Sequence, residues 1–105
     1  MSPTMRSRHQ TLRQQLSLLL TGTFRPARQL AELASISERE VEEHLAHIVR
    51  SLARDRTRRF MLRPSACHDC GFAFRDRTRL TRPSRCPRCR SEAISAPEYM
   101  IETRA

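Results

Sequence analysis

The sequence lacks tryptophan and lysine, has only two glycines and contains no long hydrophobic run. Five aromatic residues among 105 make a thin core, so a metal or another cross-link is expected to reinforce the fold. The most apolar stretch has only three unbroken leucines, Leu18–Leu20, far short of the ~20 residues that a membrane helix needs. The first ten residues lack the apolar segment of a secretory signal, so we expect a cytoplasmic protein without membrane contact.

The sequence also lacks the motifs of enzyme chemistry. It has no glycine-rich phosphate loop, no nucleophile motif and no recognisable pair of catalytic carboxylates. We therefore expect a binding protein rather than an enzyme.

Basic residues outnumber acidic residues by 20 to 11, and all the basic residues are arginine. The excess lies in residues 50–90, which hold 13 arginines and three acids, whereas residues 1–49 have a net charge of +1 and residues 91–105 a net charge of −2. A GC-rich genome explains arginine in place of lysine but not this excess. A localised basic patch is typical of nucleic-acid binding, with a solvated basic face as the alternative.

The first half of the sequence predicts a disordered tail at residues 1–10, followed by short helices. Leucines at i, i+4, i+7 and i+8 form one apolar stripe, which predicts a helix at about residues 10–20. Gly22 suits the left-handed conformation that ends such a helix. A second helix is expected at about residues 26–33, with Pro26 in its first turn.

A third helix has the clearest start signal. Ser37 and Glu40 are spaced as a capping box, and apolar residues follow at helical spacing as far as Leu52. Because only about residues 34–36 separate the second and third helices, the pair is typical of a helix-turn-helix. We assign residues 11–57 to a helix-turn-helix domain.

Two strands are predicted after the helices. Phe60 and Leu62 alternate with polar or less apolar neighbours, and Tyr99 and Ile101 do the same near the C-terminus. A proline next to each strand is expected to stop it, so the two strands would form a hairpin with a long insertion at its tip.

These elements predict an α+β fold: a winged helix-turn-helix of three helices and a β-hairpin, with a four-cysteine zinc ribbon inserted in the wing. In this prediction residues 58–105 form the wing strands and the ribbon occupies residues 66–92.

Four cysteines carry the strongest signal. Cys67, Cys70, Cys86 and Cys89 form two C-x2-C pairs separated by 15 residues, the spacing of a four-cysteine zinc site. In a cytoplasmic protein this arrangement indicates metal or redox chemistry rather than structural disulfides. Four thiolates fill the tetrahedral shell of Zn²⁺ and leave no open position for catalytic water, so we predict one structural zinc ion.

Three alternatives remain open at this site. Iron bound to the same sulfurs would make a rubredoxin-like electron carrier, and the cysteines could act as a dithiol switch. His68, between the first two cysteines, could replace one of them as a ligand.

An arginine-rich loop lies between the two cysteine pairs, and its candidate phosphate contacts are Arg75, Arg77, Arg79, Arg82 and Arg85. The first three have strand spacing and would share one face. If about five phosphates are neutralised, log affinity should fall with log salt at a slope near −4 to −5. Phe72 and Phe74 are expected to pack the ribbon core, with stacking on bases as the alternative.

The order of these features resembles a family of small prokaryotic, largely archaeal, predicted transcriptional regulators that join a helix-turn-helix to a zinc ribbon. The resemblance covers about residues 11–102 and rests on SEREVEEHLAHIVRSL, CHDCGFAF, CPRCR and RLTRPSRCPRC. It implies a winged-helix fold with a rubredoxin-like ribbon, the four cysteines as zinc ligands, the third helix as the recognition helix and no enzyme activity.

The third helix is acidic where recognition helices enter the major groove, since it carries Glu38, Glu40, Glu42 and Glu43 in its first turns. Helix-dipole and capping roles explain some of these glutamates. The candidate groove contacts on this helix are Arg39, Glu43, His44 and His47, and both histidines are expected to face solvent.

The function expected from these observations is that of a DNA-binding transcriptional regulator or a chromatin-associated accessory factor. The alternative is a zinc-ribbon adaptor that binds a protein partner, RNA or both. A redox or metal-sensing role is the third possibility, and the oligomeric state is left open.

Overall fold

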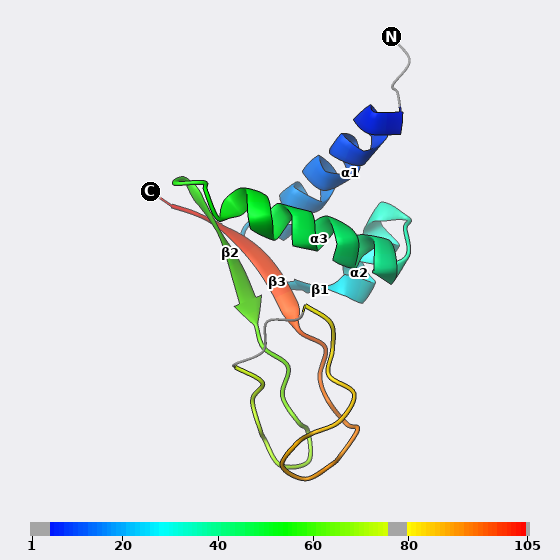
Figure 1. Ribbon diagram of the computed structural model, residues 1–105, viewed down its shortest axis with the longest axis vertical. Helices are drawn as coiled ribbons and strands as arrows, with labels where there is room; N and C mark the ends of the chain where they lie inside the picture. Colours follow the sequence, from blue (N-terminus) through cyan, green and yellow to red (C-terminus); the bar gives the residue numbers. More distant parts are fainter. Residues whose placement is uncertain (1–4, 76–79, 105) are drawn as a thin grey trace.

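The computed structural model describes residues 5–75 and 80–104, which form helices, a three-stranded antiparallel sheet and an extended ribbon (Figure 1). The helices are α1 (Met5–Leu20), α2 (Ala27–Ala34) and α3 (Glu38–Leu52), and the strands are β1 (Arg25–Pro26), β2 (Arg58–Arg63) and β3 (Glu98–Thr103). The ribbon is the connection between β2 and β3, residues 64–97. The α+β class and the ribbon between the hairpin strands are confirmed.

Helix α1 begins at Met5, inside the segment predicted to be a disordered tail. The two arginines and the one glutamine of this segment are good helix formers, and the segment has no glycine or proline after Pro3, so its helix propensity favours an early start of α1. Residues 1–4 lie outside the described part of the chain. None of the helices described is long and apolar enough to cross a lipid bilayer.

Helix α3 begins where its sequence predicts. The Ser37 hydroxyl accepts a hydrogen bond from the Glu40 amide at 3.1 Å, and a Glu40 carboxylate oxygen accepts one from the Ser37 amide at 2.8 Å. Both halves of the capping box are therefore present, and three residues separate α3 from α2. Ser35, the first of these three, adopts a left-handed conformation with a φ of 57°, which turns the chain sharply.

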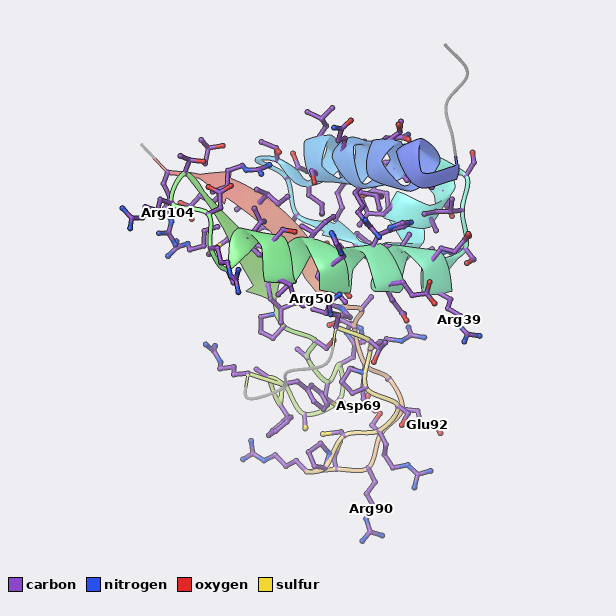
Figure 2. All side chains as sticks on the ribbon, turned by 45° about the horizontal axis from the view of Figure 1, so that its top comes forward. Arg39, Arg50, Asp69, Arg90, Glu92 and Arg104 are labelled. Atoms are coloured by element: carbon purple, nitrogen blue, oxygen red, sulfur yellow. The ribbon has the colours of Figure 1, made fainter. Side chains whose placement is uncertain are left out.

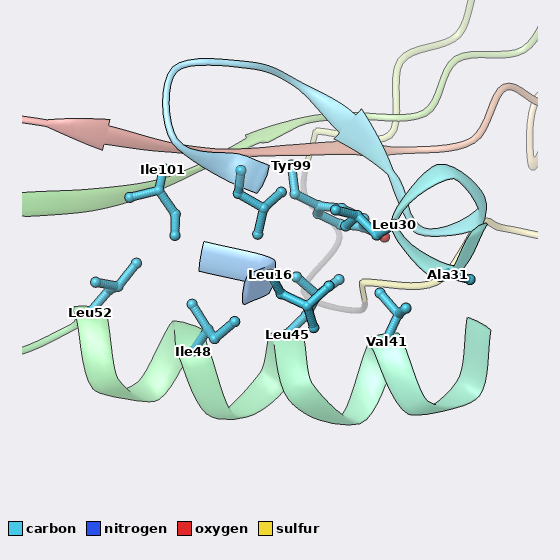
Figure 3. Packing of buried hydrophobic residues seen from close by; sticks show 10 residues of the cluster. Leu16, Leu30, Ala31, Val41, Leu45, Ile48, Leu52, Tyr99 and Ile101 are labelled. Atoms are coloured by element: carbon cyan, nitrogen blue, oxygen red, sulfur yellow. The ribbon is translucent and has the colours of Figure 1, made fainter. Parts of the chain in front are cut away.

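The core lies between the three helices and the sheet, and Figure 3 shows its side chains pointing toward one another from both layers. It contains Leu16, Leu20, Leu30, Ala31, Val41, Leu45, Ile48, Leu52, Tyr99 and Ile101. The Tyr99 hydroxyl also donates a hydrogen bond to the carbonyl of Leu80, which joins the core to the base of the ribbon. Burial, together with the negative charges of Glu42 and Glu38, raises the pKa of Tyr99 to about 12.

The sheet contains one strand that the sequence did not predict. Strands β2 and β3 pair as expected, with Phe60 opposite Ile101, but β1 also pairs with the other edge of β3. Two residues, one of them a proline, are too few to show a strand period. Gly22, which has a φ of 77°, donates its amide hydrogen bond to the Ile101 carbonyl at 3.0 Å and brings the chain from α1 to the sheet.

A short, well-bonded turn connects α3 to β2. One carboxylate oxygen of Asp55 accepts hydrogen bonds from the Thr57 amide and hydroxyl, each at 2.7 Å, and from the Arg58 amide at 3.1 Å. The Arg104 amide in turn donates to the Thr57 carbonyl at 2.7 Å. The turn therefore fixes the backbone positions of the arginines on it and next to it.

The Asp55 turn makes a prediction about pH. Hydrogen bonds from the Thr57 hydroxyl and amide, and then from Arg58, lower the pKa of Asp55 from 3.8 to about 2. Because the folded pKa lies below the unfolded one, the stabilisation is complete above about pH 4 and disappears as the pH falls through 2. Asp55→Asn should therefore be less stable than the native protein at neutral pH, and this difference should shrink between about pH 4 and pH 2.

Urea unfolding midpoints measured across that pH range test the prediction. Glu32→Gln, which removes one exposed carboxylate from α2, is the control for the loss of a single negative charge. A stability difference between Asp55→Asn and the native protein that does not change with pH would contradict it.

Candidate metal centre

The four cysteines lie on two turns of the same construction. In the first turn the Gly71 amide donates to the Cys67 carbonyl at 2.9 Å, and in the second the Arg90 amide donates to the Cys86 carbonyl at 2.8 Å. Gly71 and Arg90 occupy equivalent left-handed positions, with φ values of 78° and 62°. Gly71 adopts this conformation readily because it has no Cβ, whereas at Arg90 only the structure shows it.

The four sulfur atoms come together at one point. All lie within 4.8 Å of one another, with 3.5 Å between the sulfurs of Cys67 and Cys89 and 3.6 Å between those of Cys70 and Cys86. Sulfurs bound at about 2.3 Å at the corners of a tetrahedron lie about 3.8 Å apart, so the arrangement fits Zn²⁺. None of the four cysteines forms a disulfide.

Backbone amides stabilise the sulfurs as thiolates. Burial raises the pKa of Cys86, but hydrogen bonds from the Cys89 and Arg88 amides, together with the neighbouring thiols, lower it to about 7. The equivalent amides of Cys70 and Asp69 act on Cys67, whose pKa is also lowered despite burial.

The fourth thiolate requires a cation. A hydrogen bond from the Ser91 amide lowers the pKa of Cys89, but burial and the other three sulfurs outweigh it and raise that pKa to about 12. Four thiolates at these distances repel one another unless a divalent ion lies between them. The donor set therefore fits one structural zinc ion and leaves no open coordination position.

A small core supports the metal centre. Phe72 and Phe74 pack edge to face with ring centroids 5.1 Å apart, against buried Cys67, Cys86 and Ile94. The predicted packing role of the two phenylalanines is confirmed. His68 is exposed and is not part of the sulfur cluster.

The predicted contacts on α3 do not form one surface. Arg39 is exposed and its guanidinium lies 3.9 Å from the Glu43 carboxylate. His47 is half-buried and lines a groove beside α1. His44 is only 7% exposed, so its prediction as a solvent-facing groove contact is wrong. It lies three residues after Val41 and four before Ile48, on the buried side of the helix, and this spacing was visible in the sequence.

The arginines predicted to contact phosphates from the loop between the cysteine pairs have different surroundings. Arg75 is exposed in a turn, while Arg77 and Arg79 lie outside the described residues. The Arg85 guanidinium is 3.8 Å from the Glu92 carboxylate. Arg82 lines a concavity of about 540 Å³ with Glu38 and Glu42, at the junction of the ribbon with the helices.

The second cysteine turn carries two further arginines. Arg88 and Arg90, on the second cysteine turn, are exposed and make no ion pair with any described residue. Figure 2 shows Arg90 extending from the end of the ribbon that is farthest from the helices. The motif CPRCR contained this signal, since both arginines adjoin metal ligands. Arg75, Arg88 and Arg90 are called the ribbon arginines below.

Comparison with known proteins identifies both parts of the chain. Residues 11–61 match the PF0610-like N-terminal family, and residues 64–104 match the PF0610 rubredoxin-like zinc beta-ribbon domain family. The solution NMR structure of protein PF0610 from Pyrococcus furiosus has a TM-score of 0.74 and 27% sequence identity, over 90% of this chain and 91% of that chain. No curated protein matches the sequence at a significant level. The four-cysteine centre is thus the zinc site of a rubredoxin-like ribbon.

Proposed function

We propose that this chain, which joins a PF0610-like N-terminal domain to a rubredoxin-like zinc ribbon, is a DNA-binding transcriptional regulator. In this proposal one zinc ion holds the ribbon in shape, and the ribbon carries arginines to the phosphate backbone of duplex DNA. The protein acts in the cytoplasm, on nucleoid DNA, and catalyses no reaction.

The observation that carries the proposal is the free charge on the ribbon. The ribbon arginines are exposed, and none of them lies within ion-pair distance of a described carboxylate. Exposed guanidinium groups without partners are well suited to phosphate oxygens, which they bind with two parallel hydrogen bonds. Such contacts orient a protein on DNA without reading its sequence.

The helical part supports a winged helix-turn-helix arrangement. Helices α2 and α3 are joined by three residues, and the chain runs from α3 directly into the β2–β3 hairpin (Figure 1). In DNA-binding domains of this order the second helix of the pair enters the major groove. The proposal therefore assigns sequence reading to the exposed side chains of α3, of which Arg39, Glu43 and His47 remain candidates.

The acidic start of α3 limits what this helix contributes. Glu40 is engaged in the capping box, and Glu43 lies beside Arg39, yet Glu38 and Glu42 add negative charge at the same end and form no ion pair with any described residue. These groups repel phosphates, so in this proposal most of the affinity comes from arginines elsewhere. A glutamate can still accept a hydrogen bond from cytosine N4 in the groove.

An in vitro selection tests the proposal. The zinc-loaded protein would be used to enrich a library of random duplex DNA at near-physiological salt. A recurrent motif supports a sequence-specific regulator, and its symmetry reports the oligomeric state. Failure to retain any duplex above the level of a protein-free control would overturn the proposal.

The acidic half of α3 favours an adaptor as the second candidate. Glu38, Glu42 and Glu43 lie on the exposed or half-buried part of the helix and suit a basic segment of a partner protein. If salt abolishes DNA binding and the selection enriches no motif, the adaptor is favoured over the regulator.

A further inference from the structure

A second group of arginines gathers away from the ribbon, beside the C-terminal end of α3. The chain is elongated, with principal extents of 55, 32 and 19 Å, and the ribbon forms one end of its long axis (Figure 1). Away from the ribbon, the C-terminus of α3, the turn to β2 and the end of β3 enclose a concavity of about 510 Å³. Four arginines line it: Arg54, Arg56, Arg59 and Arg104. It is called the arginine concavity below.

Three of these four arginines carry free charge. Arg59 is bound to Glu102, with its terminal nitrogen 2.6 Å from the carboxylate. Arg54, Arg56 and Arg104 are exposed, and within the described ranges no carboxylate comes within ion-pair distance of them. The one acidic residue in the lining, Asp55, is already paired with Arg58 at 3.2 Å. The concavity therefore has a net positive charge.

Helix stabilisation does not explain the cluster. Cations near a helix C-terminus interact favourably with its dipole, and this accounts for Arg50 and Arg54. The effect falls off within the last turn, and Arg56 and Arg104 lie beyond the helix, on the turn and on the chain after β3. Figure 2 shows Arg104 beside the end of β3, well away from the ribbon residues Arg90 and Glu92.

The arginines of the concavity are held on a rigid frame. Arg54 and Arg56 flank Asp55, whose carboxylate closes the turn, and the Arg104 amide is bonded to Thr57. The floor between them is apolar and includes Phe60, whose ring is tilted against Tyr99 with centroids 6.0 Å apart. Apart from Asp55, all the polar side chains in the lining are guanidinium groups, so the site suits a repeated anion.

We propose that the arginine concavity is a second phosphate-binding surface, which holds the backbone of duplex DNA independently of the ribbon. The inference rests on the proposed function, since the ligand is the same polymer. The zinc ion with its four thiolates has a charge of −2, which offsets part of the ribbon's arginine charge, whereas the concavity has no such centre. The two surfaces together let the protein contact the backbone at two separated places.

Salt-dependent binding separates this proposal from the alternatives. The probe is a fluorescent duplex of about 20 base pairs, titrated with native protein and with Arg54→Ala/Arg56→Ala at several salt concentrations. Each lost phosphate contact should reduce the log–log salt slope by about 0.9, so the double variant should lose about 1.8. At about 0.1 M salt this corresponds to roughly 60-fold weaker binding.

The matched control is Arg28→Ala/Arg63→Ala, which removes the same charge from arginines already paired with Glu32 and Glu98. If both double variants lose affinity equally, the concavity contributes only net charge and the inference is wrong. Arg54→Gln/Arg56→Gln should reproduce the loss if the alanine variant folds poorly.

Two further outcomes are distinguishable. If the native protein binds no duplex at all, the proposed function fails together with this inference. In the second outcome the native protein binds DNA strongly, but poly-glutamate of equal charge competes with the DNA. If poly-glutamate no longer competes for Arg54→Ala/Arg56→Ala, the concavity is a site for an acidic protein segment. That result would overturn the assignment to DNA while leaving the ribbon's role intact.

Discussion

Replacement of Cys67 and Cys70 by serine is expected to remove the zinc ion, unfold the ribbon and leave the helical part folded. The ribbon core consists of buried Cys67, Cys86 and Ile94 with two half-buried phenylalanines, which is too little apolar surface to fold without the metal. The main core lies between the helices and the sheet and contains no ribbon cysteine. Zinc content should fall from one ion per chain to none, and amide resonances of residues 64–97 should lose their dispersion in NMR spectra.

DNA binding should be lost largely in the same variant, because the ribbon arginines no longer share a fixed frame. His68→Ser is the control, since His68 lies between the two replaced ligands, is exposed and is not one of the clustered ligands. It should keep the zinc ion and native affinity. Full DNA affinity in a zinc-free variant with an unfolded ribbon would rule out the ribbon as a phosphate-binding element.

Replacement of the ribbon arginines by alanine should give the second large effect. Loss of three phosphate contacts is expected to reduce the log–log salt slope by about 2.7, equivalent to roughly 500-fold weaker binding at about 0.1 M salt. The loss should be similar for all duplexes, because backbone contacts carry no sequence information. Fluorescence anisotropy with two unrelated duplexes measures both quantities.

The zinc content of this triple variant should stay at one ion per chain, which separates charge from folding. Arg28→Ala/Arg63→Ala is again the control, since it measures how much DNA affinity is lost per arginine when only the net charge of the protein changes. A weakened preference for one duplex with unchanged affinity for the other would instead place base recognition in the ribbon.

If both surfaces bind, the protein holds DNA at two separated places, the ribbon and the C-terminal end of α3, while the acidic residues lie at the start of that helix. Removal of the ribbon arginines together with Arg54 and Arg56 should then reduce log affinity by the sum of the separate losses, because distant sites act additively. The acidic helix would act by excluding wrong orientations rather than by adding affinity.

The sequence by itself determined the elements whose signals are local. The capping box at Ser37, the apolar spacing of α3 and the alternation in β2 and β3 depend on neighbouring residues, and all are present in the structure. The zinc site was equally local, since ligand type and C-x2-C spacing decide it. The same helical spacing also indicates that His44 is buried, because His44 lies on the same face of α3 as Val41 and Ile48.

Only the tertiary structure decided which arginines are free to bind a partner. Arg59 and Glu102 are 43 positions apart and form an ion pair because β2 and β3 align in one register. The chain reversal after α3 brings Arg104 beside Arg54 and Arg56. No periodicity in the sequence predicts that these three residues are neighbours. Strand β1 likewise exists only because β3 offers it an edge. Charge composition is a property of the sequence, but ion pairing depends on distances across the fold. These distances decide which arginines are neutralised by a carboxylate and which stay free, on the ribbon and in the arginine concavity.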